Sequence, residues 1–178
     1  MGSWMATIKA SGKSLDNLKD ILVLQLKDLY DAEERLIEAL PKMADASASR
    51  ELKSAFEQHL DQTRRHKERL EEVFHEIGEE VSSEKCEAMM GIVEEGEIIL
   101  KASGDAHVKD AALIGAAQRA EHYEIAGYGT ARNFAHRLGH ERAAELLQQT
   151  LDEEKETDER LTRIAESTVN PEASRSRR

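Results

Sequence analysis

Seven acidic and histidine side chains interrupt apolar helical stripes at positions where the pattern calls for an apolar residue. They are Glu33, His59, His66, Glu121, Glu124, Glu154 and Asp158. Carboxylates and imidazoles are ligands for iron, manganese and zinc. Acids and histidines that project inward from four facing helices are the pattern with which a helical bundle holds two metal ions. The spacing therefore predicts a two-metal centre built from four helices.

Members of this set that belong to the same expected helix lie one or two helical turns apart, so they share a helix face. Glu33 stands between Leu29 and Leu36, where the stripe would otherwise continue with leucine. Glu33 and Glu121 come from helices in equivalent positions of the expected repeat, and we expect them to bridge the two metals. The other five residues are then terminal ligands. A tyrosine one turn beyond Glu124, Tyr128, either hydrogen-bonds a ligand or packs in the core.

The charge of these acids separates two interpretations. Five ionised carboxylates would carry a charge of −5, and an unpaired buried charge costs several kcal/mol even after relaxation. Two divalent cations would supply most of the compensating charge. The alternative is a buried polar network without metal, in which protonated acids hydrogen-bond to His59 and His66. All four expected helices contribute ligand-type residues at the same depth of the bundle, and this joint pattern favours the metal centre.

The composition sets the class of protein. The chain has 178 residues, of which 39% are apolar and 34% charged, with 4% aromatic residues and two prolines. This composition favours helices over strands. The net charge of −11 repels phosphate backbones, so we expect no nucleic-acid partner. No stretch of about 20 apolar residues is present, so we expect no membrane span. Cys86 is the single cysteine, which fits a reducing cytoplasm.

Hydrophobic periodicity predicts four long helices and a connecting segment. The first stripe runs over 15–43 with Ser14 as its N-cap, and the second over 52–77, capped by Ser49 and ended by Gly78. The third runs from about residue 110 to Gly139, and the fourth over 144–165. A segment that opens near Ser82 and ends at 103–105 is expected to hold one or two short helices.

These elements form two helical hairpins joined by a crossover of about thirty residues, which predicts an all-α, ferritin-like four-helix bundle. We expect the bundle to span 13–167. Residues 1–12 are an N-terminal extension, whose opening before Met5 is interpreted as a cloning remnant, and 168–178 are expected to be a disordered tail. Residues 21–24 are apolar nearly all round. We expect that flank to be covered by the crossover or by a second subunit.

Five short motifs are similar to those of the YciF/YciE-type bacterial stress proteins. They are Leu29–Glu33, Leu40–Met43, Lys85–Met89, Glu121–Thr130 and Glu153–Asp158, and the resemblance extends over about 15–166. It implies a ferritin-like bundle, a homodimer, a di-iron site and a link to stress response. All candidate ligands except His66 fall on positions of the family's motifs. Gln62 stands where relatives carry glutamate, and His66, where they often carry glutamine, would compensate.

Two function hypotheses follow. The first is a ferritin-like protein with two iron ions, or manganese or zinc in their place, that reacts with O₂ or peroxide. The second is a non-catalytic helical stress or interaction module with a structural or degenerate metal site. An iron-storage cage is a third idea, but no segment reads as a cage contact.

Overall fold

The computed structural model describes residues 15–175, and all regular secondary structure in that range is helical. In chain order the elements are α1 (Leu18–Ala46), α2 (Arg50–Glu76), α3 (Glu87–Lys101), α4 (Ala106–Arg137), α5 (Glu141–Ile164), a π-helical turn η1 (Ala165–Val169) and α6 (Asn170–Arg175).

Polar caps and glycines set the ends of the long helices. The Asn17 side chain accepts a hydrogen bond from the third backbone N–H of α1 in a capping box, and Ser49 caps α2. Asp105 accepts from two backbone N–H groups at the start of α4. Gly78 and Gly139 adopt φ of 73° and 80°, a left-handed conformation that ends α2 and α4 and that glycine adopts without steric cost.

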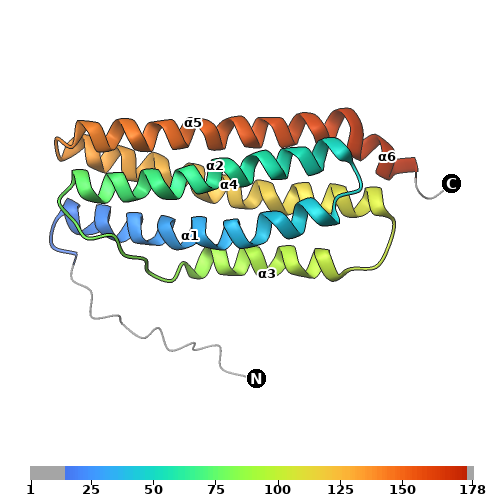
Figure 1. Cartoon of the computed structure of the whole chain (residues 1–178), viewed down its shortest axis with the longest axis horizontal. Coiled ribbons are helices and arrows are strands. Elements are labelled where there is room, and N and C mark those ends of the chain that lie inside the picture. Colours follow the sequence, from blue (N-terminus) through green and yellow to red (C-terminus); the bar gives the residue numbers. More distant parts are fainter. Residues whose placement is uncertain (1–14, 176–178) are drawn as a thin grey trace, which may run out of the picture.

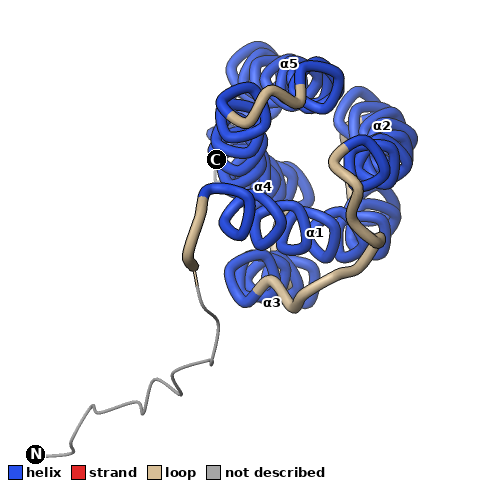
Figure 2. The backbone as a smooth tube through the Cα atoms, turned by 90° about the vertical axis from the view of Figure 1, so that its left-hand side faces the viewer, coloured by secondary structure: helices blue, strands red, loops and turns tan. Residues whose placement is uncertain are grey.

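The four long helices pair as two hairpins, α1 with α2 and α4 with α5, and contacts between α2 and α5 and between α1 and α4 close the bundle. Figure 1 shows these helices running side by side along the long axis. In Figure 2 the same four surround the bundle axis, whereas α3 lies outside them against α1 and α4. The predicted all-α, ferritin-like bundle is confirmed.

The core consists of two apolar blocks. One block contains Leu36, Phe56 and Leu161, and the other contains Leu29 and Phe74. Fully burying one such side chain contributes roughly 1.5–3 kcal/mol. On all four helices the candidate ligands lie in the sequence between residues of the two blocks. A polar layer therefore crosses a bundle that is stabilised on both sides of it.

Hydrogen bonds fasten the crossover to the bundle. The backbone N–H of Cys86 donates to Asp31 on α1 at 2.8 Å, and the Cys86 thiol lies 3.1 Å from the Tyr123 hydroxyl on α4. The N–H of Glu84 donates to the carbonyl of Lys27. The crossover thus passes beside α1, while Ile21 and Leu24 on its apolar flank stay half-buried.

Several boundaries differ from those predicted. The predicted disordered tail is wrong for residues 168–175, because η1 and α6 extend the chain as helix and Val169 is 1% exposed in the core. Within 15–175, α3 is a single crossover helix despite its glycines and begins at Glu87, later than expected. The Ser14 cap lies outside the described residues, as does the extension 1–12, and Asn17 caps α1.

In the described part of the chain no helix is long and apolar enough to cross a membrane.

Candidate metal centre

The polar layer brings together six of the seven candidate ligands, and each is at most 3% exposed. α1 contributes one, α2 two, α4 two and α5 one, in the order Glu33, His59, His66, Glu121, Glu124 and Glu154. Burial of this degree removes water as a partner for charge. The side chains must satisfy one another or a bound ion.

The six side chains form two overlapping groups. In each group, one ligand atom per residue lies within 4.8 Å of those of all other members. The first group is His59, Glu121, Glu124 and Glu154, and the second is Glu33, His66 and Glu154. Each group has the size and ligand chemistry of one metal position. Only Glu154 belongs to both groups among the described residues.

Glu154 spans the two histidines. Its Oε1 lies 2.8 Å from Nδ1 of His66, and its Oε2 lies 3.9 Å from Nε2 of His59. The sequence prediction gave the bridging position to Glu33 and Glu121, but each of these belongs to a single group. The geometry therefore makes Glu154 on α5 the bridging candidate.

The Thr157 hydroxyl orients His59. Its hydrogen is donated to the Glu153 carbonyl oxygen at 3.1 Å, so its oxygen is left to accept from Nδ1–H of His59 at 3.3 Å. The other ring nitrogen, Nε2, then carries a lone pair and faces Glu121 Oε1 at 3.1 Å. Burial lowers the pKa of His59, against the opposing effect of Glu154. The neutral ring that results has the form in which histidine binds a metal.

His66 is held by a carboxylate and an arginine that the sequence prediction did not include. Its Nε2 lies 2.7 Å from Glu153 Oε2, and Arg69 binds Glu153 Oε1 at 3.2 Å and Thr150 at 2.6 Å. Nδ1 of His66 therefore faces the centre. A carboxylate on the outer nitrogen of a ligating histidine is a recurrent feature of metal sites, because it fixes the ring and raises its basicity.

Most polar atoms inside the layer lack a hydrogen-bond partner. In residues 15–175, nine buried side-chain atoms are without one, and eight of them belong to the six candidate ligands. Both carboxylate oxygens of Glu124 are among them. The short contact between His66 and Glu154 is not aligned as a hydrogen bond. A self-sufficient polar network would have satisfied these atoms with hydrogen bonds. The ligand atoms of a metal site, in contrast, lack hydrogen bonds because the metal ion is their partner.

Burial also sets the protonation of the acids. It raises the pKa of Glu121 to about 8 and that of Glu124 well above its ordinary value, where neighbouring carboxylates add to the effect. Burial also raises the pKa values of Glu33 and Glu154, although the nearby His66 opposes this effect. Burial disfavours the charge on His66, but Glu154, Glu33 and Glu153 outweigh it and raise its pKa to about 12. Without a cation the layer holds protons.

The other two sequence expectations near the centre have different outcomes. Asp158 lies outside both groups: its carboxylate accepts a hydrogen bond from Gln118 at 3.0 Å and lies 3.3 Å from Nε2 of His122. Tyr128 is fully buried and donates a hydrogen bond to Glu33 Oε1, so it both packs in the core and holds a candidate ligand. Gln62 lines a polar cleft between α2 and α5 that also includes Thr157.

An all-α, ferritin-like bundle with a buried carboxylate–histidine cluster is the class of protein that this fold and site define. The chain belongs to the family described as Domain of unknown function (DUF892), whose model matches residues 17–174. It is similar to Protein YciF of Escherichia coli (strain K12), with 42% identity over 161 residues that cover 90% of this chain and 97% of that protein.

Solved structures show the same likeness. The crystal structure of the E. coli stress protein YciF matches with a TM-score of 0.85 and 41% identity, covering 88% of this chain and 99% of that one. YcfI from Rhodopseudomonas palustris matches with a TM-score of 0.82 and 36% identity, covering 85% and 96%. The resemblance stated from the sequence motifs is confirmed.

Proposed function

We propose that this protein holds two metal ions, most suitably iron, in the polar layer and reacts there with O₂ or peroxide as part of a bacterial stress response. The eight buried atoms of the six ligand candidates that lack a hydrogen bond carry this proposal. The link to stress is an extension from the E. coli stress protein YciF. Histidine and carboxylate ligands suit iron, with manganese or zinc as alternatives.

Charge supports two divalent ions. The four buried glutamates of the layer would carry −4 when ionised, and two divalent cations supply +4. Bound cations would thus remove the burial penalty that otherwise keeps these acids protonated. When iron is bound, its chemistry is the supply of electrons to an oxygen species.

The chain's own residues prepare the position of each ligand. Thr157 and Glu153 fix the two histidines so that one ring nitrogen of each faces inward. Tyr128 holds one oxygen of Glu33 and leaves the other unpartnered. The apolar blocks on either side keep bulk water from the layer. Ligands that are held in place before binding lose little freedom when the ion arrives.

The test is metal content after loading with Fe(II), measured by elemental analysis and compared with a matched pair of variants. Glu124→Gln exchanges a carboxylate for an amide inside the first group, and Asp158→Asn makes the same exchange outside both groups. We expect about two ions per wild-type chain and for Asp158→Asn, and a loss of at least one ion for Glu124→Gln. A wild type without stoichiometric metal, or a Glu124→Gln variant with full occupancy, refutes the proposal.

A non-catalytic helical module is the second candidate. The half-buried apolar side chains Ile21 and Leu24 on α1 favour it, because they offer a surface for a second copy of the chain. We propose a cytoplasmic homodimer through this flank in either case. Light scattering measures the mass: a monomer refutes the dimer. Tight dimerisation combined with no O₂ consumption or peroxide loss by the metal-loaded protein favours the module over catalysis.

A further inference from the structure

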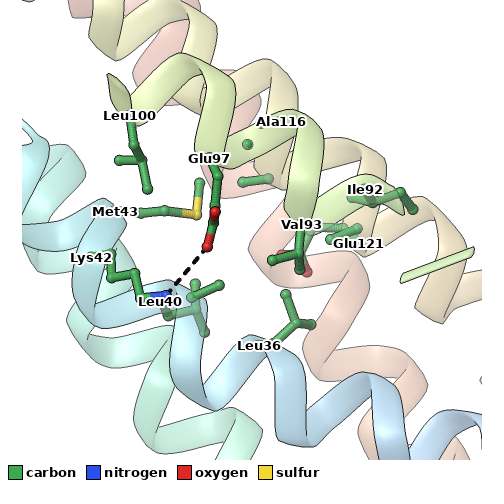
Figure 3. A pocket seen from close by; sticks show the side chains of 14 residues that line it. Leu36, Leu40, Lys42, Met43, Ile92, Val93, Glu97, Leu100, Ala116 and Glu121 are labelled. Carbon is green, nitrogen blue, oxygen red and sulfur yellow. Dashed lines mark hydrogen bonds and ion pairs between the residues drawn. The ribbon is translucent and has the colours of Figure 1, made fainter. Parts of the chain in front are cut away.

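An apolar cavity of about 30 Å³ lies between α1, α3 and α4 and includes a candidate metal ligand in its wall. Leu36 and Met43 line it from α1, Val93 and Gly96 from α3, and Glu121 from α4. Figure 3 shows the apolar side chains converging on this space from the facing helices. Almost all of its wall is therefore hydrocarbon.

The cavity lies between the protein surface and the centre. On the outer side, Lys42 and Glu97 form an ion pair of 3.5 Å and are both partly exposed; it is the dashed line in Figure 3. On the inner side stands Glu121, which is 1% exposed and whose Oε1 is 3.1 Å from Nε2 of His59. A molecule in this cavity would be next to the first metal position.

The size and lining restrict what can enter. A cavity of 30 Å³ has room for about two water-sized molecules, and apolar cavities of this kind stay dry and bind apolar guests. Hydrogen peroxide is a donor and acceptor, and a hydrocarbon wall does not compensate the hydrogen bonds that it loses on leaving water. Dioxygen is diatomic and apolar, so it loses none.

A second, chemically opposite cleft provides the contrast. It lies between α2 and α5, has a volume of about 350 Å³, and is lined by polar and charged side chains that include Asp61, Arg65 and Thr157. Thr157 contacts the outer nitrogen of His59. A polar oxidant or a hydrated ion would use this side of the bundle rather than the apolar cavity.

We propose that the oxidant of this centre is dioxygen and that it reaches Glu121 through the apolar cavity. This inference rests on the proposed function, because the route serves a reaction only if the metal centre is present. The affinity of the cavity for a small apolar gas does not depend on a metal. Gly96 keeps the space open. A Cβ added there would meet only Ala116 Cβ, at 3.9 Å, so tight helix packing does not require this glycine, although a glycine inside a helix costs stability.

The direct test places xenon, an apolar probe, in pressurised crystals of the metal-free protein. We expect a xenon atom in the cavity of the wild type and none in Gly96→Leu, whose side chain fills the space. Gly91→Leu is the matched control: it makes the same change on the same helix, where an added Cβ has no neighbour within 4 Å. It should retain xenon. Absence of xenon from the wild-type cavity, or equal occupancy in Gly96→Leu, overturns the proposal.

Kinetics of the Fe(II)-loaded protein provide the second test. With O₂, Gly96→Leu should react about tenfold more slowly than the wild type and Gly91→Leu within about twofold, because a filled interior leaves no passage. With hydrogen peroxide, both variants should match the wild type. Equal slowing for both oxidants, or none with O₂, refutes the dioxygen route.

The two proposals fail separately. A wild type that binds no iron refutes the metal centre, while xenon in its cavity still shows a site for an apolar gas. A wild type that binds two iron ions but excludes xenon refutes the route alone. If Gly96→Leu does not fold, the xenon experiment on the wild type decides.

Discussion

Replacing Glu124 by leucine should stabilise the metal-free protein and abolish metal binding at the first position. Both carboxylate oxygens of Glu124 are buried without a hydrogen-bond partner, and the side chain is fully buried. Each unsatisfied buried polar atom costs about 1–3 kcal/mol. Leucine removes both atoms and adds apolar surface, against a cost of fitting its branched shape.

The expected gain in the free energy of unfolding is about 2–4 kcal/mol, in line with what replacing buried charged groups by apolar ones achieves elsewhere. For a domain of this size that raises Tm by roughly 4–16 °C. The assay is thermal unfolding in the presence of a chelator, repeated after addition of Fe(II). Added metal should raise the Tm of the wild type, because it binds only the folded state, and raise that of Glu124→Leu by less, because only the second group keeps its ligands.

Glu57→Leu on the exposed face of α2 is the control for a change of glutamate to leucine without burial, and its effect should be within about 0.5 kcal/mol. If metal-free Glu124→Leu is less stable than the wild type, Glu124 makes hydrogen bonds in a satisfied network. The carboxylate oxygens of Glu124 would then be satisfied without a metal ion.

Three further predictions follow from the same contacts. The metal-free protein should lose stability in urea titrations as the pH rises from about 5 to about 8. Burial raises the pKa of Glu121 to about 8, so over this range the folded state retains a proton that the unfolded chain releases. A free energy of unfolding that rises over this range would contradict the prediction. Glu153→Gln should weaken metal binding about 10–100-fold in competition titrations, whereas Glu159→Gln, on an exposed position of α5, should not. Gly127→Ala should lower the free energy of unfolding by about 1–2 kcal/mol in urea, because an added Cβ would lie 2.7 Å from a buried leucine of α1. An added Cβ at Gly91 meets no neighbour. Gly91→Ala should therefore raise the free energy of unfolding by about 0.5–1 kcal/mol, because alanine is the better helix former.

The sequence predicted the bundle well because its signals are local. Stripes of 3.6-residue period mark the buried faces, and Gly78 and Gly139 mark helix ends where the backbone adopts positive φ. Ser14 was a poorer choice of cap than Asn17, since both are capping residues and only the capping box with Asp20 separates them. Val169 was an available sign of an ordered tail, because it is an apolar side chain in a polar segment and packs into the core.

Periodicity does not separate positions that differ by one residue on the same face. Thr157 and Asp158 lie three and four residues after Glu154, so both fit an inward position. The structure turns Thr157 to His59 and Asp158 to Gln118. Glu153 stands in an acidic run that reads as a solvated face, and its role depends on contacts with Arg69 and His66 across the bundle. Such contacts between distant segments carry no local signal.

The two metal positions should differ in how they take up a cation. His59 is held neutral by burial, with its Nε2 lone pair directed inward by the bond to Thr157. His66 carries a proton on the nitrogen that faces Glu154, because the surrounding carboxylates raise its pKa to about 12. A cation at the second position must displace that proton, whereas a cation at the first position must displace protons from Glu121 and Glu124, whose pKa values burial raises.

Occupancy of both positions should therefore fall as the pH is lowered, since proton and metal compete for the same atoms. Calorimetric titration in two buffers of different ionisation enthalpy measures the protons released at each step. Raising the pH from about 7 to about 9 should remove the proton released by Glu121, whose pKa is about 8, and keep the one released by His66, whose pKa is about 12. A proton release that stays the same over this pH range would show that the carboxyl proton of Glu121 is not displaced by the metal.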